Sequence, residues 1–397
     1  MSSSPDITAR IVTAIADLAP EAWDACANPD ARTFNPFVAH AFLAALESAG
    51  TVGGRSGWAP AHIAIDDDAG GLAACMPLYV KGHSQGEYVF DHGWADAYER
   101  AGGRYYPKLQ GAVPFTPVPG PRLLVRPGED AALRRRQLAG AGIALARRFG
   151  ASSLHVTFMR DDEWRDLGAQ GFLLRTDRQF HWINHGYAGF DDFLASLASR
   201  KRKAIRRERE QALSGGLEIE QVTGAAIREA HWDAMFAFYM DTGSRKWGRP
   251  YLNRAFFSEL GARLPERCLL VLVRRAGRYV AGALNLVGGD CLYGRYWGAL
   301  EHHPALHFEV CYYQAIDYSI RHCLARVEAG AQGEHKLARG YLPAETYSAH
   351  WIADAGLRRA VAHYLEHERE AIALDADELT AAGPYRKAGS PAPDEQE

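Results

Sequence analysis

Cysteine is scarce in this 397-residue sequence, which has six cysteines and no C-x-x-C pair among them. That scarcity argues against a disulfide framework and against a zinc site built from paired thiolates. The sequence also has no uninterrupted apolar stretch that could span a bilayer, and its start lacks a basic segment followed by an apolar one. We therefore expect a cytoplasmic protein with no membrane span and no signal peptide.

The motifs of several large enzyme classes are missing as well. There is no G-x-S-x-G elbow and no Walker A loop, which disfavours a hydrolase triad and a P-loop NTPase. No G-x-G-x-x-G follows a predicted strand and opens a helix. The net charge of −3 gives no overall field that would attract nucleic acid or an anionic membrane.

Two histidine-rich segments have some features of metal sites. HYLEH at 363–367 matches an inverted zinc-peptidase motif, but its surroundings have the pattern of an ordinary amphipathic helix. EHHPALHFE at 301–309 has no recognisable ligand spacing, and Pro304 interrupts its helical register. The sequence therefore predicts no metal cofactor.

The chain does have a substantial core and an order of elements that occurs twice. It is 47% hydrophobic and 23% charged, as in globular proteins, and its length suits two domains. Each half shows a strand meander, then an amphipathic helix, then a further strand. In the first half we expect strands over 61–66, 72–80, 152–159, 171–177 and 180–186, and a helix over 130–150. In the second we expect three strands within 268–300, a helix over 306–324 and a strand over 325–330. This order is typical of a mixed α/β acyltransferase domain, present twice.

A strongly basic segment joins the two halves. Residues 191–210 have the apolar face of one long helix, and residues 200–210 carry seven Lys and Arg side chains against two Glu. A solvated basic face is the ordinary alternative. In a chain of net negative charge, this concentration favours binding of an anion such as a phosphate, a pyrophosphate or an RNA backbone.

Aromatic side chains gather in two stretches. In the strand YGRYWGAL at 293–300, strict alternation would place Tyr293, Arg295 and Trp297 on one face and Tyr296 on the other. An arginine among aromatics needs an acidic partner if it is buried. The segment 86–124 has seven aromatics, with His92 and Lys108 among them. It is either the wall of a small-molecule or peptide pocket or a loop packed on the core by its own aromatics.

An acid, an imidazole, an amine and a guanidinium gather in EAGAQGEHKLARGYLP, which runs from Glu328 to Pro343. The segment is punctuated by glycines, which allow close approach of the backbone to a substrate. Just before it, His307 and Glu309 open the predicted helix of the second half, where they could contact a bound anion or a substrate amine. Such concentrations of titratable groups favour chemistry over binding alone.

Several stretches resemble one family. Residues 86–109, 113–124, 179–210, 281–320 and 328–352 are similar to the bacterial FemAB-like proteins, which are peptidoglycan biosynthesis/recognition proteins of the GNAT acyltransferase superfamily. The resemblance implies an α/β (α+β) fold with tandem GNAT-like domains, each a mixed, mostly antiparallel twisted sheet flanked by helices. We expect a lead-in over 1–32, an N-terminal GNAT-like domain over 33–186, a basic helical connector and the start of the second domain over 187–262, a C-terminal GNAT-like domain over 263–382 and a flexible tail over 383–397.

The resemblance also implies acyl transfer to an amine. Well-understood Fem relatives move an amino acid from aminoacyl-tRNA onto an amine of a peptidoglycan precursor, whereas ordinary GNAT enzymes use acyl-CoA. It supports Glu328 and Lys336 as site residues, and it makes Arg202, Lys203 and Arg206 candidates for anion or tRNA binding. The turn EHHPALHF has no glycine, unlike the pyrophosphate-binding turn of GNAT domains, which argues against acyl-CoA binding in this half. The choice of donor, aminoacyl-tRNA or acyl-CoA, stays undecided.

We predict direct aminolysis of an activated acyl group, with a small-molecule or peptide amine as acceptor. Lys336, supported by Arg295, would stabilise the oxyanion or a donor phosphate, and Glu309, Glu328 or His335 would bind or deprotonate the amine. The predicted substrate-binding residues are His92, Trp94, Tyr106, Lys108, Tyr296, Trp297, His307 and Arg339. The alternatives are an acyl-CoA-dependent N-acyltransferase and a non-catalytic protein that binds peptide, glycan or RNA.

Overall fold

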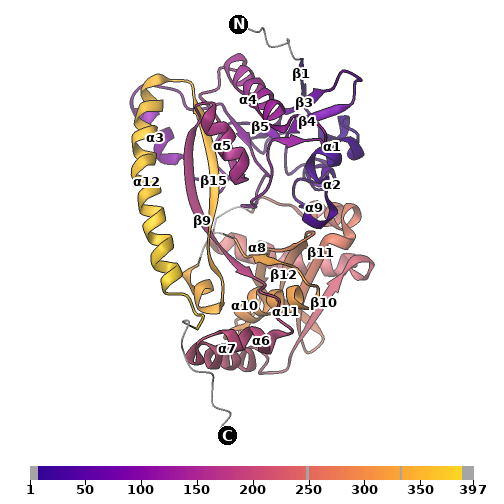
Figure 1. Ribbon diagram of the computed structural model, residues 1–397. Coiled ribbons are helices and arrows are strands. Elements are labelled where there is room, and N and C mark those ends of the chain that lie inside the picture. Colours follow the sequence, from indigo (N-terminus) through magenta and orange to yellow (C-terminus); the bar gives the residue numbers. More distant parts are fainter. Residues whose placement is uncertain (1–7, 247–249, 331–332, 387–397) are drawn as a thin grey trace.

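The computed structural model of this chain describes residues 8–246, 250–330 and 333–386 (Figure 1). Most of the tail that we expected over 383–397 lies outside the described residues. Within them, no helix combines the length and the apolar character that a membrane crossing requires.

The first half contains the following elements: β1 (Ala9–Val12), η1 (Ile15–Asp17), α1 (Pro20–Ala27), η2 (Ala31–Thr33), α2 (His40–Ser48), β2 (Trp58–Pro60), β3 (His62–Asp66), β4 (Leu72–Met76), β5 (Leu78–Lys81), α3 (His92–Arg100), β6 (Lys108–Gly111), β7 (Leu124–Val125), α4 (Ala131–Arg148), β8 (Ser153–Met159), α5 (Asp161–Ala169) and β9 (Leu173–Ile183).

The second half contains α6 (Phe190–Ser196), α7 (Ser199–Ala212), β10 (Leu217–Thr223), η3 (Gly224–Ala226), α8 (Glu229–Lys246), α9 (Arg254–Arg263), η4 (Pro265–Arg267), β11 (Cys268–Arg275), β12 (Arg278–Val287), β13 (Cys291–Ala299), α10 (Leu306–Phe308), the π-helical turn η5 (Glu309–Tyr313), α11 (Gln314–Arg321), β14 (Arg326–Glu328), η6 (Glu334–Arg339), β15 (Leu342–Ile352) and α12 (Ala355–Ala381).

One long mixed sheet runs through both halves. Its order is β10-β11-β12-β13-β14-β9-β15-β8-β6-β5-β2, and a second sheet has the order β1-β3-β4-β7. Helices cover both, so the predicted α/β class and the flanked mixed sheets are confirmed (Figure 1). The apolar run of β11 suits a strand that lies between β10 and β12 and is covered on both faces. Leu270 and Leu272 enter one core, whereas Leu269 and Val271 enter the core on the opposite face.

The last strand of the chain lies in the middle of this sheet. β15 pairs with β8 on one side and with β9 on the other, and β9 pairs with β14 at its far end. The long helix α12 packs against β9 and β15 (Figure 1). The predicted boundaries place residues 342–381 in the second domain, yet β15 pairs with strands of the first half and α12 packs against β9. The boundaries themselves stay a prediction.

The two halves also share a hydrophobic core. Phe42 of α2 meets Phe256 of α9 edge to face at 5.9 Å, and Phe37 meets Tyr293 of β13 at 5.2 Å. These rings belong to one buried cluster drawn from both halves. Because burial of aromatic area dominates core energetics, this packing fixes the position of β13 against the first half.

Three predicted elements differ from the observed ones. The expected strand over 72–80 divides at Pro77 into β4 and β5, which enter different sheets, because proline cannot donate to a ladder. The two strands expected over 171–177 and 180–186 are one strand, β9. The helix expected over 191–210 breaks at Leu197, which is extended, buried and bridged to Tyr385.

Candidate functional site

A β-bulge in β13 determines which side chains face the first half. Across from β12, Asn285 pairs with Gly294 and Leu284 with Tyr296, so Arg295 is the extra residue. Strict alternation is lost at such a bulge. Tyr296 therefore packs on the same core as Tyr293, and Trp297 packs on the opposite one. The predicted common face for Tyr293 and Trp297 was wrong for this reason.

Arg295 and Glu328 form a buried charged pair on this face. Their side chains are 3% and 2% exposed, and Nη2 of Arg295 lies 3.6 Å from Oε2 of Glu328. The Nη1 group of Arg295 donates to the carbonyl oxygens of Gly294 (2.9 Å) and Glu328 (3.4 Å). Phe37 and Tyr293 lie 5.0 and 5.3 Å from the guanidinium, within cation–π distance.

His181 joins this pair from the neighbouring strand. It is the register partner of Glu328 across β14 and β9. Burial lowers the pKa of His181, and the positive charges of Arg326, Arg295 and Lys336 lower it further against the opposing effect of Glu328. The imidazole is therefore neutral at neutral pH and able to accept a proton.

Lys336 lies close enough to His181 and Arg295 to interact electrostatically with both. Burial lowers its pKa to about 7, and the charge of Arg295 contributes to the shift. Its Nζ donates to the carbonyl oxygens of Ala329 (2.7 Å) and Gly330 (2.8 Å), directly after β14. An ammonium group has three donors, so one remains beyond these two bonds.

Glu309 and Arg339 are held by the basic helix α7. Glu309 is fully buried, and both of its carboxylate oxygens accept from Arg209 at 3.0 Å. Arg339 binds Glu208 in the same two-pronged way, at 3.1 and 2.7 Å, and lies 3.4 Å from the ring centroid of Phe308. These two predicted residues join α7 to the loop that carries Lys336.

An aromatic and imidazole cluster lies beside that loop. The ring of His307 is 5.4 Å from Trp297 and 6.0 Å from His335. The exposed His335 also shares a hydrogen bond with the hydroxyl of Tyr312 at 2.9 Å. Tyr296, in contrast, is on the other face, where its hydroxyl donates to the carbonyl of Phe115 at 3.3 Å.

The outer face of α7 keeps its positive charge. Lys203 and Arg206 are exposed and Arg202 is half-buried. Arg206 lies 3.5 Å from Asp191, whereas no ion pair within the described part of the chain engages Arg202 or Lys203. α7 contacts α10, η5 and η6, so the helix that carries this basic face adjoins the loop that contains Lys336.

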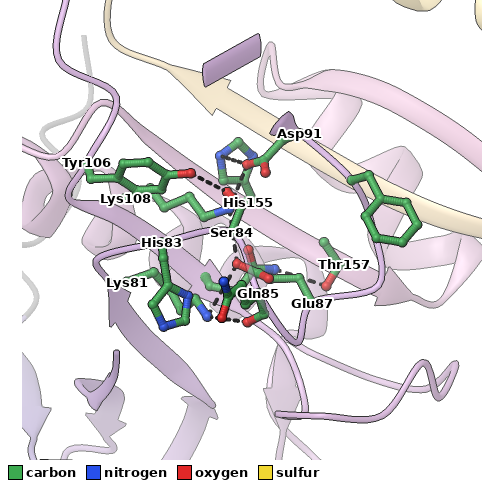
Figure 2. A network of polar contacts seen from close by, with 12 residues as sticks. Lys81, His83, Ser84, Gln85, Glu87, Asp91, Tyr106, Lys108, His155 and Thr157 are labelled. Carbon is green, nitrogen blue, oxygen red and sulfur yellow. Dashed lines mark hydrogen bonds and ion pairs between the residues drawn. The ribbon is translucent and has the colours of Figure 1, made fainter. Parts of the chain in front are cut away.

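Two of the four predicted substrate residues of the first half, Tyr106 and Lys108, belong to a buried charge network (Figure 2). Nζ of Lys108 lies 2.6 Å from Asp91 and 3.1 Å from Glu87, and it donates to Ser84 at 2.7 Å. Tyr106 donates to the same serine hydroxyl at 2.8 Å. Lys108 is only 1% exposed, so in this structure it holds the loop between β5 and α3.

Lys81 extends the network on its other side. Its Nζ lies 3.3 Å from Glu87, donates to the carbonyl of Gln85 at 2.7 Å and sits 3.5 Å from the Trp58 ring centroid (Figure 2). Burial lowers the pKa of Lys81 to about 7, although Glu87 opposes the shift. Two lysines and two carboxylates thus balance each other away from water.

A pair of neutral histidines completes the buried region. Nδ1 of His155 lies 2.7 Å from Nδ1 of His350, and burial lowers the pKa of His155 to about 3. The Trp94 ring meets His350 edge to face at 5.0 Å. His92 is exposed at the start of α3, where its ring stacks on Phe90 at 6.2 Å.

The loop held by this network also contains a strained residue. Tyr88, between Glu87 and Asp91, has a φ of +61°, which is rare for a bulky residue and concentrated at functional sites. Burial raises the pKa of Tyr88, Tyr239 and Tyr251 raise it further, and Arg295 lowers it. The loop therefore brings a phenol of the first half into electrostatic contact with the guanidinium of the second.

Sequence reasoning missed His181, Tyr88 and the acidic members of the network. His181 had a usable signal, because it alternates with Phe180 and Trp182, whose rings enter the core on one face of β9. Its imidazole must then face the other way, toward Glu328. In the described ranges, no group of three or more His, Cys, Asp or Glu side chains is arranged to hold a metal ion.

A model of the FemAB-like family, described as peptidoglycan biosynthesis/recognition, matches residues 14–387. The chain belongs to the FemAB-like family. This FemAB-like membership supports an acyl- or aminoacyltransferase related to peptidoglycan. A search of curated protein sequences found no match.

Solved structures agree with the FemAB-like chain in fold. FemX has 13% identity, and the match covers 90% of this chain and 100% of FemX with a TM-score of 0.54. A conserved protein of unknown function from Bacteroides thetaiotaomicron has 14% identity, 88% and 100% coverage and a TM-score of 0.51. The DUF2156 C-terminal domain of a protein assigned as a lysylphosphatidylglycerol synthetase from Agrobacterium fabrum has 11% identity, 90% and 96% coverage and a TM-score of 0.50. At these identities the likeness shows the fold alone.

Proposed function

We propose that this FemAB-like protein transfers an acyl or aminoacyl group to an amine, at the site formed by Arg295, Glu328, His181 and Lys336. The observation that carries the proposal is the meeting of four ionisable groups from β13, β14, β9 and η6 in a buried environment, with two pKa values lowered toward or below neutrality. Such poised groups are what proton transfer at neutral pH requires.

The reaction begins with removal of a proton from the acceptor ammonium. Neutral His181 takes that proton, while Glu328 on the facing strand holds the amine. The nitrogen lone pair then attacks the acyl carbonyl carbon, a C–N bond forms and the carbonyl oxygen becomes an oxyanion. Lys336, which retains one donor, stabilises that oxyanion.

Collapse of the tetrahedral intermediate completes the transfer. The oxyanion electrons re-form the carbonyl, the bond to the donor oxygen or sulfur breaks, and the proton on His181 passes to the leaving group. The nitrogen of the intermediate still carries two protons, and it gives one of them through Glu328 to solvent, so that a neutral amide remains. No covalent enzyme intermediate is needed, because the two substrates meet directly and positioning supplies much of the rate. Glu309 and His335 have no step in this scheme. Glu309 anchors α7 through Arg209, and His335 belongs to the aromatic and imidazole cluster beside the Lys336 loop.

The basic face of α7 supports aminoacyl-tRNA as the donor. Reversing the charges of Arg202, Lys203 and Arg206 together is expected to weaken tRNA binding and to make the slope of log K against log salt less steep, by about 0.7 to 0.9 for each phosphate that is no longer neutralised. Filter binding over a salt series measures this slope. The matched control reverses three exposed arginines elsewhere, Arg100, Arg104 and Arg148. Equal slopes in both triple variants and the wild type would remove α7 from the donor site.

Product mass spectrometry tests the proposed reaction itself. The protein is incubated with a mixture of aminoacyl-tRNAs or with acyl-CoAs, each against a panel of amines that includes peptidoglycan-precursor peptides. The expected result is a new amide whose mass equals that of the acceptor plus the acyl group minus one hydrogen. It is formed with aminoacyl-tRNA and strongly reduced in the Lys336→Gln variant. An amide formed only from acyl-CoA keeps the transfer chemistry and changes the donor. Absence of any amide with both donors contradicts the proposal.

A further inference from the structure

The edge of the Arg295 guanidinium formed by Nε and Nη2 is buried and leaves hydrogen bonds unmade. We call this edge the fork. Within the described residues, its Nε and Nη2 atoms have no hydrogen-bond partner, and neither has Oε2 of Glu328. Both side chains are more than nine-tenths buried. Buried donors and acceptors without partners are costly and uncommon, so each one calls for a ligand or a water molecule.

The same two nitrogen atoms bind carboxylates elsewhere in this protein. Arg175, Arg209 and Arg339 each hold a glutamate through Nε and Nη2, at 2.7 to 3.1 Å. This parallel pair of donors matches the two oxygens of a carboxylate. In Arg295, Nη1 donates to two backbone carbonyls, which fixes the orientation of the guanidinium. Its carboxylate-binding edge then has no hydrogen-bond partner within the described residues.

Glu328 restricts what can bind at that edge. Its Oε1 accepts from Nε of Arg326 at 3.2 Å, whereas its Oε2 lies 3.6 Å from Nη2 of Arg295. A simple carboxylate in the fork would therefore bring an oxygen close to Oε2, a like charge at short range in a poorly solvated region. A simple ammonium bound to Glu328 would meet the guanidinium for the same reason. A molecule that carries a carboxylate and an amine on one carbon satisfies both groups at once.

We propose that Arg295 and Glu328 form a recognition site for the zwitterionic head of an α-amino acid, free or at an unblocked centre of a peptide precursor. Arg295 binds the carboxylate and Glu328 binds the amine. This inference rests on the proposed function and deepens it, because the amine held by Glu328 faces His181 across β14 and β9. The acceptor is then an amine with a carboxylate on the adjacent carbon.

Binding measurements with single-charge analogues test the site without any assay of transfer. Isothermal titration calorimetry of the full chain is performed with L-alanine, D-alanine, ethylamine and propionate. At least one alanine enantiomer is expected to bind about 10- to 100-fold more tightly than either analogue, since each analogue lacks one of the two charge-assisted hydrogen bonds. Equal binding of ethylamine or propionate, or binding of none of the four, overturns the proposal and assigns the unpaired atoms to water.

Variants of Arg295 and Glu328 test whether alanine binds at this site. Arg295→Lys keeps the charge and removes the fork, and it is expected to lose alanine binding by about the same 10- to 100-fold. Glu328→Gln keeps the size and is expected to lose discrimination against propionate. The control, Arg275→Gln, changes an exposed arginine that pairs with Glu301. Unchanged alanine affinity in a folded Arg295→Lys protein overturns the assignment.

These experiments distinguish a failure of the amino-acid site from a failure of the proposed transferase function. Alanine binding with no amide product from any donor supports the amino-acid site and contradicts the transferase function. Efficient transfer to ethylamine, at the same kcat/KM as to alanine, supports the transferase function and overturns the amino-acid site.

Discussion

Replacing Lys336 by glutamine is expected to lower the rate of amide formation by about 10²–10³-fold. Glutamine can still donate to the carbonyl oxygens of Ala329 and Gly330, which Lys336 binds at 2.7 and 2.8 Å, so the loop after β14 keeps its anchor. The substitution removes the positive charge beside the developing oxyanion. Single-turnover kinetics with a saturating donor measure the effect.

The pH profile distinguishes this role from a structural one. The pKa of Lys336 is lowered to about 7 by burial and by Arg295, so its charged form predominates below that pH and disappears above it. A rate that depends on the ammonium therefore falls as the pH rises through about 7. The Gln variant is expected to lack this descending limb, because its side chain does not titrate.

Two results would count against the role of Lys336. One is a folded Gln variant with wild-type turnover. The other is a variant with a lower rate but an unchanged pH profile, which would assign to Lys336 only the anchoring of the loop. Circular dichroism and a thermal melt verify that the variant folds.

Replacing Lys108 by methionine is expected to lower the free energy of unfolding by about 3–5 kcal/mol, the usual cost of breaking a buried ion pair by removing one partner. Lys108 lies 2.6 Å from Asp91 and 3.1 Å from Glu87 (Figure 2). Both carboxylates are about 4% exposed, so water cannot replace the missing ammonium. Urea denaturation followed by intrinsic fluorescence measures the change.

Lys203→Met is the matched control, since it removes the same charge from the exposed face of α7. Its effect on stability is expected to stay within about 0.5 kcal/mol. If the two lysine variants unfold at the same urea concentration, the network contributes nothing measurable to stability, and its proposed role in holding the Tyr88 loop falls with it.

Local patterns predicted much of this fold because periodicity reports local structure. The amphipathic helix α4 lies within two residues of its expected bounds, and β11 begins at residue 268, where the expected strands begin. The boundaries at Pro77 and Leu197 were missed for different reasons. Pro77 is a local signal within an otherwise continuous apolar run, whereas Leu197 is held extended by a contact with Tyr385, near the end of the described chain, and no local pattern reports such a contact.

The candidate site likewise has a part that the sequence predicted and a part that depends on contacts distant in the sequence. Composition and resemblance identified Arg295, Glu328 and Lys336 as site candidates, and the structure brings them near one another. The bulge at Arg295 could not be foreseen, since it depends on pairing with β12. The buried network needed knowledge that Lys81 and Lys108 lie on neighbouring strands β5 and β6, which places both amines over carboxylates of an irregular loop.

The central position of β15 also sets an order of synthesis and assembly. Since β15 separates β8 from β9, the ribosome releases nearly the whole chain before the first half can complete its sheet. Until then β8 and β9 expose unpaired edges, which are templates for pairing with other chains. We therefore expect the nascent first half to stay prone to aggregation until residues 342–352 have emerged and β15 has paired with both strands.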